Sequence, residues 1–337
     1  MKLYLGIFAI LCCFYTGCKE PNRSKKAEAD PGTIYIGQVQ WPGYIALTIA
    51  KEQRFFEEVG LDVEIETLDS IQKLNEAYDA GKYQGRTNLL VDAIQQSMEG
   101  VDHRVIFAFD YSNGSDAIVS DPTIENPADL VGKKVSFEKG TIAEYFLRYV
   151  LNQYGFSIND IDPVDATAMG GITLLENGEV DAAVTYEPFL SEILDKGNHH
   201  NLFSSSEAPG LITDVMTFRK DFLEKYPDAT LRFCQAYFKA LDILFDEPDK
   251  AHKILAKQWG LTPLEIQTQL EGIQVLDLRL NKTAFSVGSA SNSIYSNARI
   301  MHELVSKSKD WEKTFQHDEI LERTYLRRME TELQNPL

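Results

Sequence analysis

The stretch that decides the fold is FAFDYSNGSDAIVS, which runs from Phe107 to Ser120. Its two ends are apolar and typical of buried strands, whereas its middle, Asp110–Asp116, is a cluster of turn formers with a carboxylate at each end. The Asn113-Gly114 pair favours a hairpin, in which the two strands would pair with each other. The alternative is that the strands belong to different sheets and that the polar middle crosses between them.

Strand-like and helix-like segments alternate on both sides of this stretch. Upstream, TIYIGQV (33–39) and LDVEIETL (61–68) alternate, and a helical pattern of apolar residues separates them. Downstream, a second unit of strands and helices begins near Pro122, and the chain is helical from about residue 221 onward. Short connections between alternating strands and helices predict an α/β fold with mostly parallel sheets.

The N-terminus is typical of an exported protein. Lys2 precedes a short apolar run that ends in Thr16-Gly17-Cys18, which predicts a signal peptide over residues 1–17. This ending resembles a bacterial lipoprotein signal, in which Cys18 is lipidated; an ordinary cleaved signal is the alternative. Residues 18–32 are polar without apolar periodicity and predict a flexible tether. We therefore expect a membrane-anchored lipoprotein in the periplasm or on the cell surface.

Charge and cysteine content limit the function classes. The chain has 33 Lys and Arg against 51 Asp and Glu, a net charge of −18. An acidic balance argues against nucleic-acid binding, which requires clustered basic surface. Once the signal is removed and Cys18 is acylated, Cys234 is the remaining cysteine, so we expect no intramolecular disulfide and a buried, unreactive thiol.

Five blocks of sequence carry a family resemblance. In order they are IYIGQVQWPGYIALTIAKEQRFFEEVGLDVEI, FAFDYSNGSDAIV, DLVGKKVSFEKGT, NGEVDAAVTYEPF and PGLITDVMTFR. In order and spacing they resemble the periplasmic substrate-binding proteins of ABC importers, in the nitrate/sulfonate/taurine and thiamine-pyrimidine group. The resemblance covers residues 33 to about 280.

The resemblance implies a two-lobed α/β periplasmic-binding-protein fold, type II-like, with two crossing hinge strands. Lobe 1 would comprise residues 33–115 and 215–337, the second part mostly helical, and lobe 2 residues 116–214. The crossings would run through 112–118 and 211–218, which favours the crossing over the hairpin for the opening stretch. The implied function is capture of a small polar nitrogen- or sulfur-containing organic molecule and its delivery to the membrane subunits of an ABC importer, by a monomer without cofactor or metal.

Two strand ends near the N-terminus carry side chains that suit a ligand, because ligands of open α/β sheets lie beyond the carboxyl ends of strands. In the first, Gly43 allows close approach of a ligand, Tyr44 opens a helix, and Trp41 either stacks on a flat or cationic ligand or packs against that helix. In the second, Asn88 either contacts the ligand or caps the next helix, and Arg86 is expected at the edge of the cleft.

Two further strand ends lie in the predicted second lobe. Gly140 permits a tight turn and Thr141 begins a helix, whose free amides would receive a carboxylate, a sulfonate or another polar oxygen; a plain strand-turn-helix is the alternative. Tyr186 and Glu187 form a polar strand tip, at which family members often carry Trp-Glu-Pro or Trp-Asp-Pro. Glu187 alternatively caps the following helix.

The predicted crossings add polar groups to the cleft. We expect Ser112 and Asn113 to face it, and Asp116 and Asp214 to contact the ligand or fix the hinge. With Asp110 nearby and few basic residues, buried carboxylates would need donors from the ligand. The sequence therefore favours a ligand with an amine or a donor-rich heterocycle, including a zwitterionic one, over nitrate.

Catalysis is not favoured by the sequence, which lacks G-x-S-x-G, P-loop and H-E-x-x-H motifs. His199-His200 is expected in a loop rather than at a metal site. Two alternatives stay open. One is a pyrimidine-synthase-like enzyme of the same fold, which would need a histidine at the cleft. The other is a subunit that reports ligand to a membrane sensor.

Overall fold

The computed structural model describes residues 28–286, 293–309, 311 and 316–334. The predicted signal peptide, Cys18 and most of the predicted tether lie outside the described residues. Pro31–Leu337 forms one compact unit.

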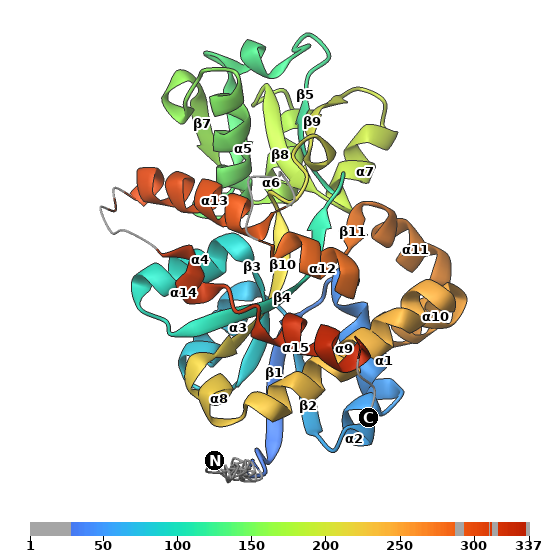
Figure 1. Cartoon of the computed structure of the whole chain (residues 1–337). Helices are drawn as coiled ribbons and strands as arrows, with labels where there is room; N and C mark the ends of the chain where they lie inside the picture. Colours follow the sequence, from blue (N-terminus) through green and yellow to red (C-terminus); the bar gives the residue numbers. More distant parts are fainter. Residues whose placement is uncertain (1–27, 287–292, 310, 312–315, 335–337) are drawn as a thin grey trace, which may run out of the picture. The chain divides into compact units, whose positions relative to one another are not determined.

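Two sheets organise this unit (Figure 1). The first has the order β11-β4-β10-β3-β1-β2. β1 pairs in parallel with β2 and β3, whereas β10 runs antiparallel to β3 and β4. The bounds of these strands are β1 Thr33–Val39, β2 Asp62–Leu68, β3 Gly85–Leu89, β4 His103–Ser112, β10 Thr213–Arg219 and β11 Ile273–Val275.

The second sheet has the order β7-β6-β8-β5-β9, with β6 parallel to β7 and β8, and β5 antiparallel to β8 and β9. Its strands are β5 Asp116–Ser120, β6 Lys134–Phe137, β7 Asp162–Asp165, β8 Ala182–Tyr186 and β9 His200–Ser204. Its helices are η2 Pro127–Leu130, α5 Ile142–Gln153, η3 Ile158–Asp160, α6 Ala168–Glu176, α7 Phe189–Asp195 and η4 Ser205–Glu207.

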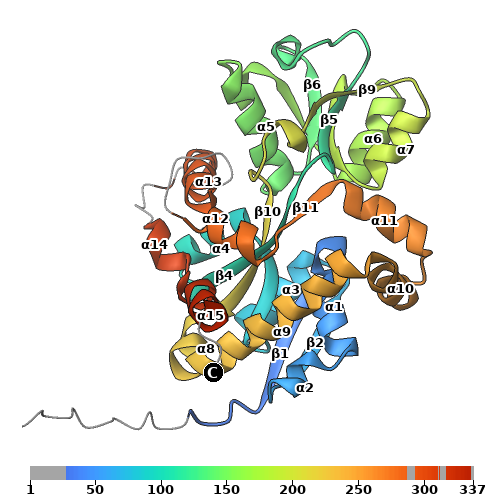
Figure 2. The same cartoon turned by 45° about the vertical axis from the view of Figure 1, so that its right-hand side comes forward.

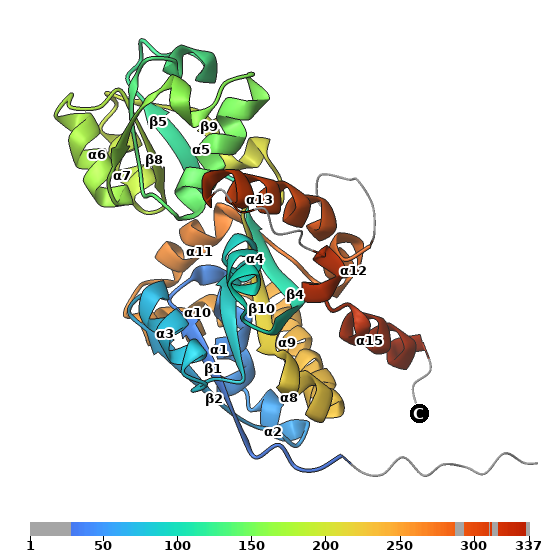
Figure 3. The ribbon, with the colours of Figure 1, turned by 90° about the vertical axis from the view of Figure 1, so that its left-hand side faces the viewer.

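The helices of the first sheet come from both ends of the chain. The N-terminal ones are η1 Pro42–Tyr44, α1 Ile45–Glu52, α2 Phe55–Glu58, α3 Ile71–Asp79 and α4 Leu90–Glu99. The C-terminal ones are α8 Lys220–Lys225, α9 Pro227–Asp246, α10 Pro248–Trp259, α11 Pro263–Glu271, α12 Leu278–Ala284, α13 Ile294–Lys309, α14 His317–Ile320 and α15 Thr324–Gln334. Figure 3 shows α13 beside α4, and it also packs against α5 of the second sheet.

Buried aromatic side chains pack α9 against β4 of the first sheet. Phe107 and Phe109 of β4 are fully buried and contact Tyr237 of α9, with ring centroids 4.4 Å and 5.4 Å away. Burial of such large rings contributes most of the apolar stabilisation of a core. This packing holds β4, and the crossing that follows it, in a fixed position on the first sheet.

The segment Phe107–Ser120 crosses between the two sheets. β4 belongs to the first sheet and β5 to the second, as Figure 2 shows, so the Asn113-Gly114 turn does not form a hairpin. Ser205 Oγ lies 2.7 Å from Ser112 Oγ and accepts from Gly114 N at 2.8 Å. Asn113 N donates to Gly272 O at 2.9 Å. Protein groups therefore satisfy the backbone of the crossing, as burial requires.

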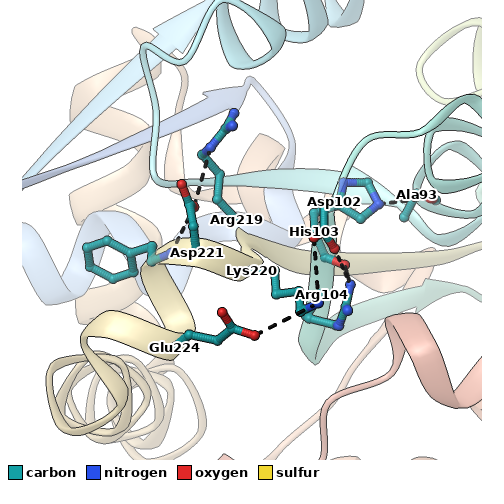
Figure 4. A network of polar contacts seen from close by, with 9 residues as sticks. Ala93, Asp102, His103, Arg104, Arg219, Lys220, Asp221 and Glu224 are labelled. Carbon is teal, nitrogen blue, oxygen red and sulfur yellow. Dashed lines mark hydrogen bonds and ion pairs between the residues drawn. The ribbon is translucent and has the colours of Figure 1, made fainter.

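An ionic network lies where β4 begins and β10 ends (Figure 4). Asp102 contacts Arg104 Nη1 at 2.9 Å and Lys220 Nζ at 3.7 Å, and Lys220 also contacts Glu224 at 3.8 Å. Apart from the half-buried Arg104, these groups are exposed, so each pair contributes at most about 1 kcal/mol. The network joins the strand ends but leaves the opposite ends of the strands to form the site.

Within the described part of the chain, no helix combines the length and the apolar character needed to cross a membrane.

Candidate functional site

A cleft of about 1130 Å³ is lined by residues of both sheets. The first sheet contributes the segments that follow β1, β2 and β3, together with Asp214 of β10. The second contributes Asp116 of β5, the turn between β6 and α5, and the end of β8. The cleft thus lies at the strand ends where ligands of open α/β sheets bind.

The charge of this cleft is strongly one-sided. Seven acidic residues line it, and none of its described lining residues is Lys, Arg or His. The acidic residues are Asp69, Glu76, Asp79, Asp92, Asp116, Glu138 and Asp214. Carboxylates gathered in one concave, partly desolvated space repel anions and attract cations.

The turn after β1 brings an indole and a phenol to two buried carboxyls. Pro42 occupies the first position of η1, where its missing N–H costs nothing. Trp41 Nε1 lies 3.3 Å and 3.2 Å from the two carboxyl oxygens of Asp110, and Tyr44 Oη donates to Asp214. Gly43 is required here, because a Cβ atom at this position would lie 1.8 Å from Asp110 Oδ2.

Asp110 and Asp214 are directly opposite each other on β4 and β10. Such neighbours have Cβ atoms about 5 Å apart, and both side chains are buried. Burial and the facing Asp214 carboxyl raise the pKa of Asp110 well above its usual value. Burial likewise raises the pKa of Asp214 to about 7, although the Tyr44 hydrogen bond opposes the shift. The pair therefore retains a proton near neutral pH or requires a cation.

Two more carboxyls at the cleft are shifted in the same direction. Burial raises the pKa of Asp116 to about 6, with a further contribution from Glu187 and an opposing hydrogen bond from Ser112. Burial also raises the pKa of Asp92 to about 6. Ionising these groups together costs free energy that a bound cation would recover.

The turn between β6 and α5 has the predicted helix cap. Thr141 is the N-cap of α5 and accepts from Ala143 N at 3.2 Å, and Gly140 adopts a φ of +75°. Both residues line the cleft. However, Gly140 N donates to Glu144 Oε2 at 2.8 Å, and Glu138 also lines the cleft. A carboxylate of the protein already occupies one of the amides that an anion would need.

Arg86 does not line the cleft, contrary to the prediction that it lies at its edge. Its side chain is fully buried, donates to Asn75 Oδ1 and Gln96 Oε1, and stacks on the Tyr78 ring with its Cζ atom 4.3 Å from the centroid. The reason is that β3 directs Arg86 towards α3 and α4, which cover it. Asn75 and Gln96 line the cleft and separate the Arg86 side chain from it.

The other predicted residues divide into two groups. Asn88 lines the cleft, and it does not cap α4, whose N-cap is Leu89. Tyr186 also lines the cleft and is 40% exposed. Residues that line the cleft are therefore Trp41, Tyr44, Asn88, Asp116, Gly140, Thr141, Tyr186 and Asp214.

Gly43 does not line the cleft either, because the Asp110 carboxyl, and not a ligand, approaches it closely. The other three predicted residues contact neighbouring protein groups instead. Ser112 is buried against Ser205, and Asn113 is exposed. Glu187 accepts from Ser191 N at 3.2 Å and Ser191 Oγ at 2.9 Å, which agrees with the capping alternative.

The polar faces of α3 and α4 also line the cleft and were not predicted from the sequence. Asp92, Gln95 and Gln96 line the cleft and recur at positions i, i+3 and i+4 of α4, which places them on one helix face. Asn75 and Asp79 have the same spacing on α3. This periodicity directly after a strand was the available signal. Among the described residues, no group of three or more His, Cys, Asp or Glu is arranged to hold a metal ion.

Comparison with known proteins gives a consistent picture. Residues 41–251 match the model of the family described as NMT1/THI5 like. The taurine-binding periplasmic protein of Escherichia coli is 25% identical over 267 residues, covering 75% of this chain and 81% of that protein. A putative aliphatic sulfonates-binding protein of the same organism is 25% identical over 250 residues, covering 73% and 77%.

Solved structures agree in fold. The periplasmic aliphatic sulphonate-binding protein SsuA of Escherichia coli superimposes with a TM-score of 0.69 at 19% identity, covering 84% of this chain and 95% of that one. A putative sulfonate-binding protein of Methylobacillus flagellatus gives 0.73 at 15% identity, covering 92% and 97%. A desulfurization enzyme, DSZB, shares the fold at 13% identity, covering 90% and 99%, with a TM-score of 0.61. The predicted α/β periplasmic-binding-protein fold and the predicted resemblance are confirmed.

Proposed function

The chain belongs to the NMT1/THI5-like family, and we propose that it is the solute-binding protein of an ABC importer whose ligand is a small organic molecule with an amine or another cationic group. Its relatives include a taurine-binding periplasmic protein and a putative aliphatic sulfonates-binding protein.

The observation that carries the choice of ligand is the charge of the cleft. Seven acidic and no basic side chains line it among the described residues. An inorganic anion such as nitrate would enter without a positively charged side chain in contact, against a negative potential. An ammonium group instead supplies the donors and the charge that the buried Asp110–Asp214 pair lacks.

The cleft also supports a mechanism of closure. A ligand that contacts Asp214 of the first sheet and Asp116 or Tyr186 of the second binds best when the two sheets are close together. It therefore shifts the population towards that state. The crossing at Ser112–Asp116 and β10 would act as the hinges between lobe 1 (33–115 and 215–337) and lobe 2 (116–214). Membrane subunits of the importer would recognise the closed form.

The proposal includes the cellular location of the protein and its monomeric state. A signal peptide over residues 1–17 and a lipid on Cys18 would place a monomer at the outer side of a membrane, with residues 18–32 as its tether. One lipid chain alone binds a membrane weakly, so the complete lipoprotein modification would be needed for stable anchoring. The alternative is that the protein reports its ligand to a membrane sensor instead of an importer. Identifying the membrane proteins that co-purify with it would distinguish the two.

An enzymatic role has less support. The pyrimidine-synthase alternative requires a histidine at the cleft, and none of the described lining residues is histidine. The likeness to the desulfurization enzyme is one of fold.

Calorimetric titration of the apoprotein tests the proposal. The panel consists of small amines, cationic or donor-rich pyrimidines, sulfonates without an amine, nitrate and sulfate. We expect measurable affinity in the amine or heterocycle group, with Asp214→Asn weakening it at least tenfold, since an ionic hydrogen bond contributes about 1.5–3 kcal/mol. Nanomolar binding of nitrate or sulfate would contradict the proposal.

A further inference from the structure

Three carboxamide side chains, those of Asn75, Asn88 and Gln96, lie between Arg86 and the cleft, and we call them the Asn75–Gln96 wall. The guanidinium is fully buried and donates to Asn75 Oδ1 of α3 and to Gln96 Oε1 of α4. Gln96 Oε1 also accepts from Asn88 Nδ2 at 3.1 Å. All three carboxamide residues line the cleft, although the arginine behind them does not.

This arrangement determines the orientation of the amides. A guanidinium has five donors and no acceptor, so only the oxygen of Asn75 and of Gln96 can face Arg86. The usual ambiguity between the oxygen and nitrogen of an amide is therefore removed. Nδ2 of Asn75 and Nε2 of Gln96 must point away from the arginine, and in the described part of the chain neither donates a hydrogen bond to protein.

The arginine also places a buried positive charge directly behind the wall. No carboxylate of a described residue lies within ion-pair distance of the Arg86 guanidinium, whose neighbours are amide oxygens and the Tyr78 ring. Its Nε atom is buried without a partner. A buried, incompletely neutralised cation polarises the amides that it contacts and strengthens them as donors on their far side. Asp79 and Asp92 lie on the same helix faces and act on the Arg86 charge from beyond ion-pair distance, so the wall is a donor surface flanked by carboxyls.

We propose that the Asn75–Gln96 wall is a second subsite, which receives a hydrogen-bond acceptor of the ligand such as a sulfonate, carboxylate or carbonyl oxygen. The inference rests on the proposed function, in which the carboxyls of the cleft hold the cationic end. It deepens that function by making the ligand two-ended, with an ammonium or similar cation at one end and an oxygen acceptor at the other. Arg86 is a positioning residue, because it acts through the amides.

Asn75→Asp isolates the acceptor subsite with little change in shape. The new carboxylate still accepts from Arg86, which protects the fold, but it replaces the donor that faces the cleft with an acceptor. Gln95→Glu on α4 is the matched control. It adds the same charge to the lining, keeps the acceptor for Tyr145 Oη at 3.4 Å, and leaves the Arg86 contacts intact. Urea unfolding of each variant verifies that it is folded.

The probes are taurine and β-alanine, which have both ends, ethylamine, which has only the cation, and ethanesulfonate, which has only the acceptor. We expect calorimetry to rank a two-ended probe first, with ethylamine at least tenfold weaker and ethanesulfonate without binding. Asn75→Asp should weaken the two-ended probe at least tenfold, the cost of losing a charge-assisted hydrogen bond. The change in ethylamine affinity caused by Asn75→Asp should be small. It should be smaller than the change in the affinity for the two-ended probe that the control Gln95→Glu causes.

The outcomes separate the two hypotheses. If ethylamine binds as tightly as taurine and β-alanine, and Asn75→Asp affects all three equally, the acceptor subsite is refuted while the cationic site stands. If ethanesulfonate binds and ethylamine and the two-ended probes do not, the proposed function fails, and the inference fails with it. Absence of binding by every amine-bearing probe at millimolar concentration also counts against both.

Discussion

Replacing Asp214 by asparagine should stabilise the apoprotein at high pH. Asp214 is 6% exposed and lies opposite the fully buried Asp110, with Tyr44 Oη as its donor. Asparagine keeps the size of the side chain and an oxygen that accepts from Tyr44, but it cannot ionise. The variant therefore removes the like-charge pair and retains the packing.

The pKa of Asp214 determines the sign and size of the effect. Burial raises this pKa from 3.8 to about 7, so between these pH values the folded state retains a proton that the unfolded state has lost. Stability consequently falls as pH rises through this window and stays low above it. A shift of about 3 units at 1.36 kcal/mol per unit amounts to about 4 kcal/mol at pH 8.

Urea unfolding of the ligand-free protein at pH 4, 6 and 8 measures this effect. The wild type should lose free energy of unfolding from pH 4 to pH 8, and so should Asp214→Asn, because the pKa values of Asp92, Asp110 and Asp116 are raised as well. The variant should lose less by up to about 4 kcal/mol, and exceed the wild type by that amount at pH 8. Asp221→Asn, at a side chain that is 78% exposed, is the control and should follow the wild-type curve. The result that refutes this reasoning is a variant that is less stable than the wild type by the same free energy at pH 4 and at pH 8. The buried carboxyl pair would then not be strained.

Three further changes test other parts of the structure. Gly43→Ala should destabilise the protein by about 1–3 kcal/mol in urea unfolding and abolish binding, because the new Cβ overlaps Asp110; unchanged binding would contradict the tight turn. Ser205→Ala should cost about 1–3 kcal/mol by removing the acceptor of the crossing, whereas the exposed neighbour Ser206→Ala should cost much less; equal effects would refute the assigned role. The Cys234 thiol is buried and burial raises its pKa, so it should react with a thiol reagent only after unfolding; rapid labelling of the native protein would disprove this.

The fold could be predicted because its signals are local. Alternating strands and helices predicted the α/β fold, and Thr141 lies at the predicted helix start. The prediction of mostly parallel sheets was wrong, because β10, β11, β5 and β9 pair antiparallel with their neighbours. The Asn113-Gly114 pair shows the limit of such signals. Its local preference is a hairpin, but β4 pairs with β10 and β11 and β5 pairs with β8 and β9, so long-range pairing determines the result.

The site was less predictable because it depends on register and on facing directions. The opposition of Asp110 and Asp214 follows from pairing between strands about a hundred residues apart, which no local pattern reveals. Arg86 and Asn88 share one face of β3 because side chains alternate with a period of two. The sequence does not indicate that α3 and α4 cover this face, so Arg86 was expected at the cleft when in fact it supports the residues that line it.

The most direct test of the central claim is native mass spectrometry of the protein purified from its own cells without denaturation, followed by fragmentation of any released small molecule. The acidic cleft predicts a bound compound that contains an amine or a cationic heterocycle, at a stoichiometry of one per chain. A bound inorganic anion, or a sulfonate without a basic nitrogen, would contradict the account.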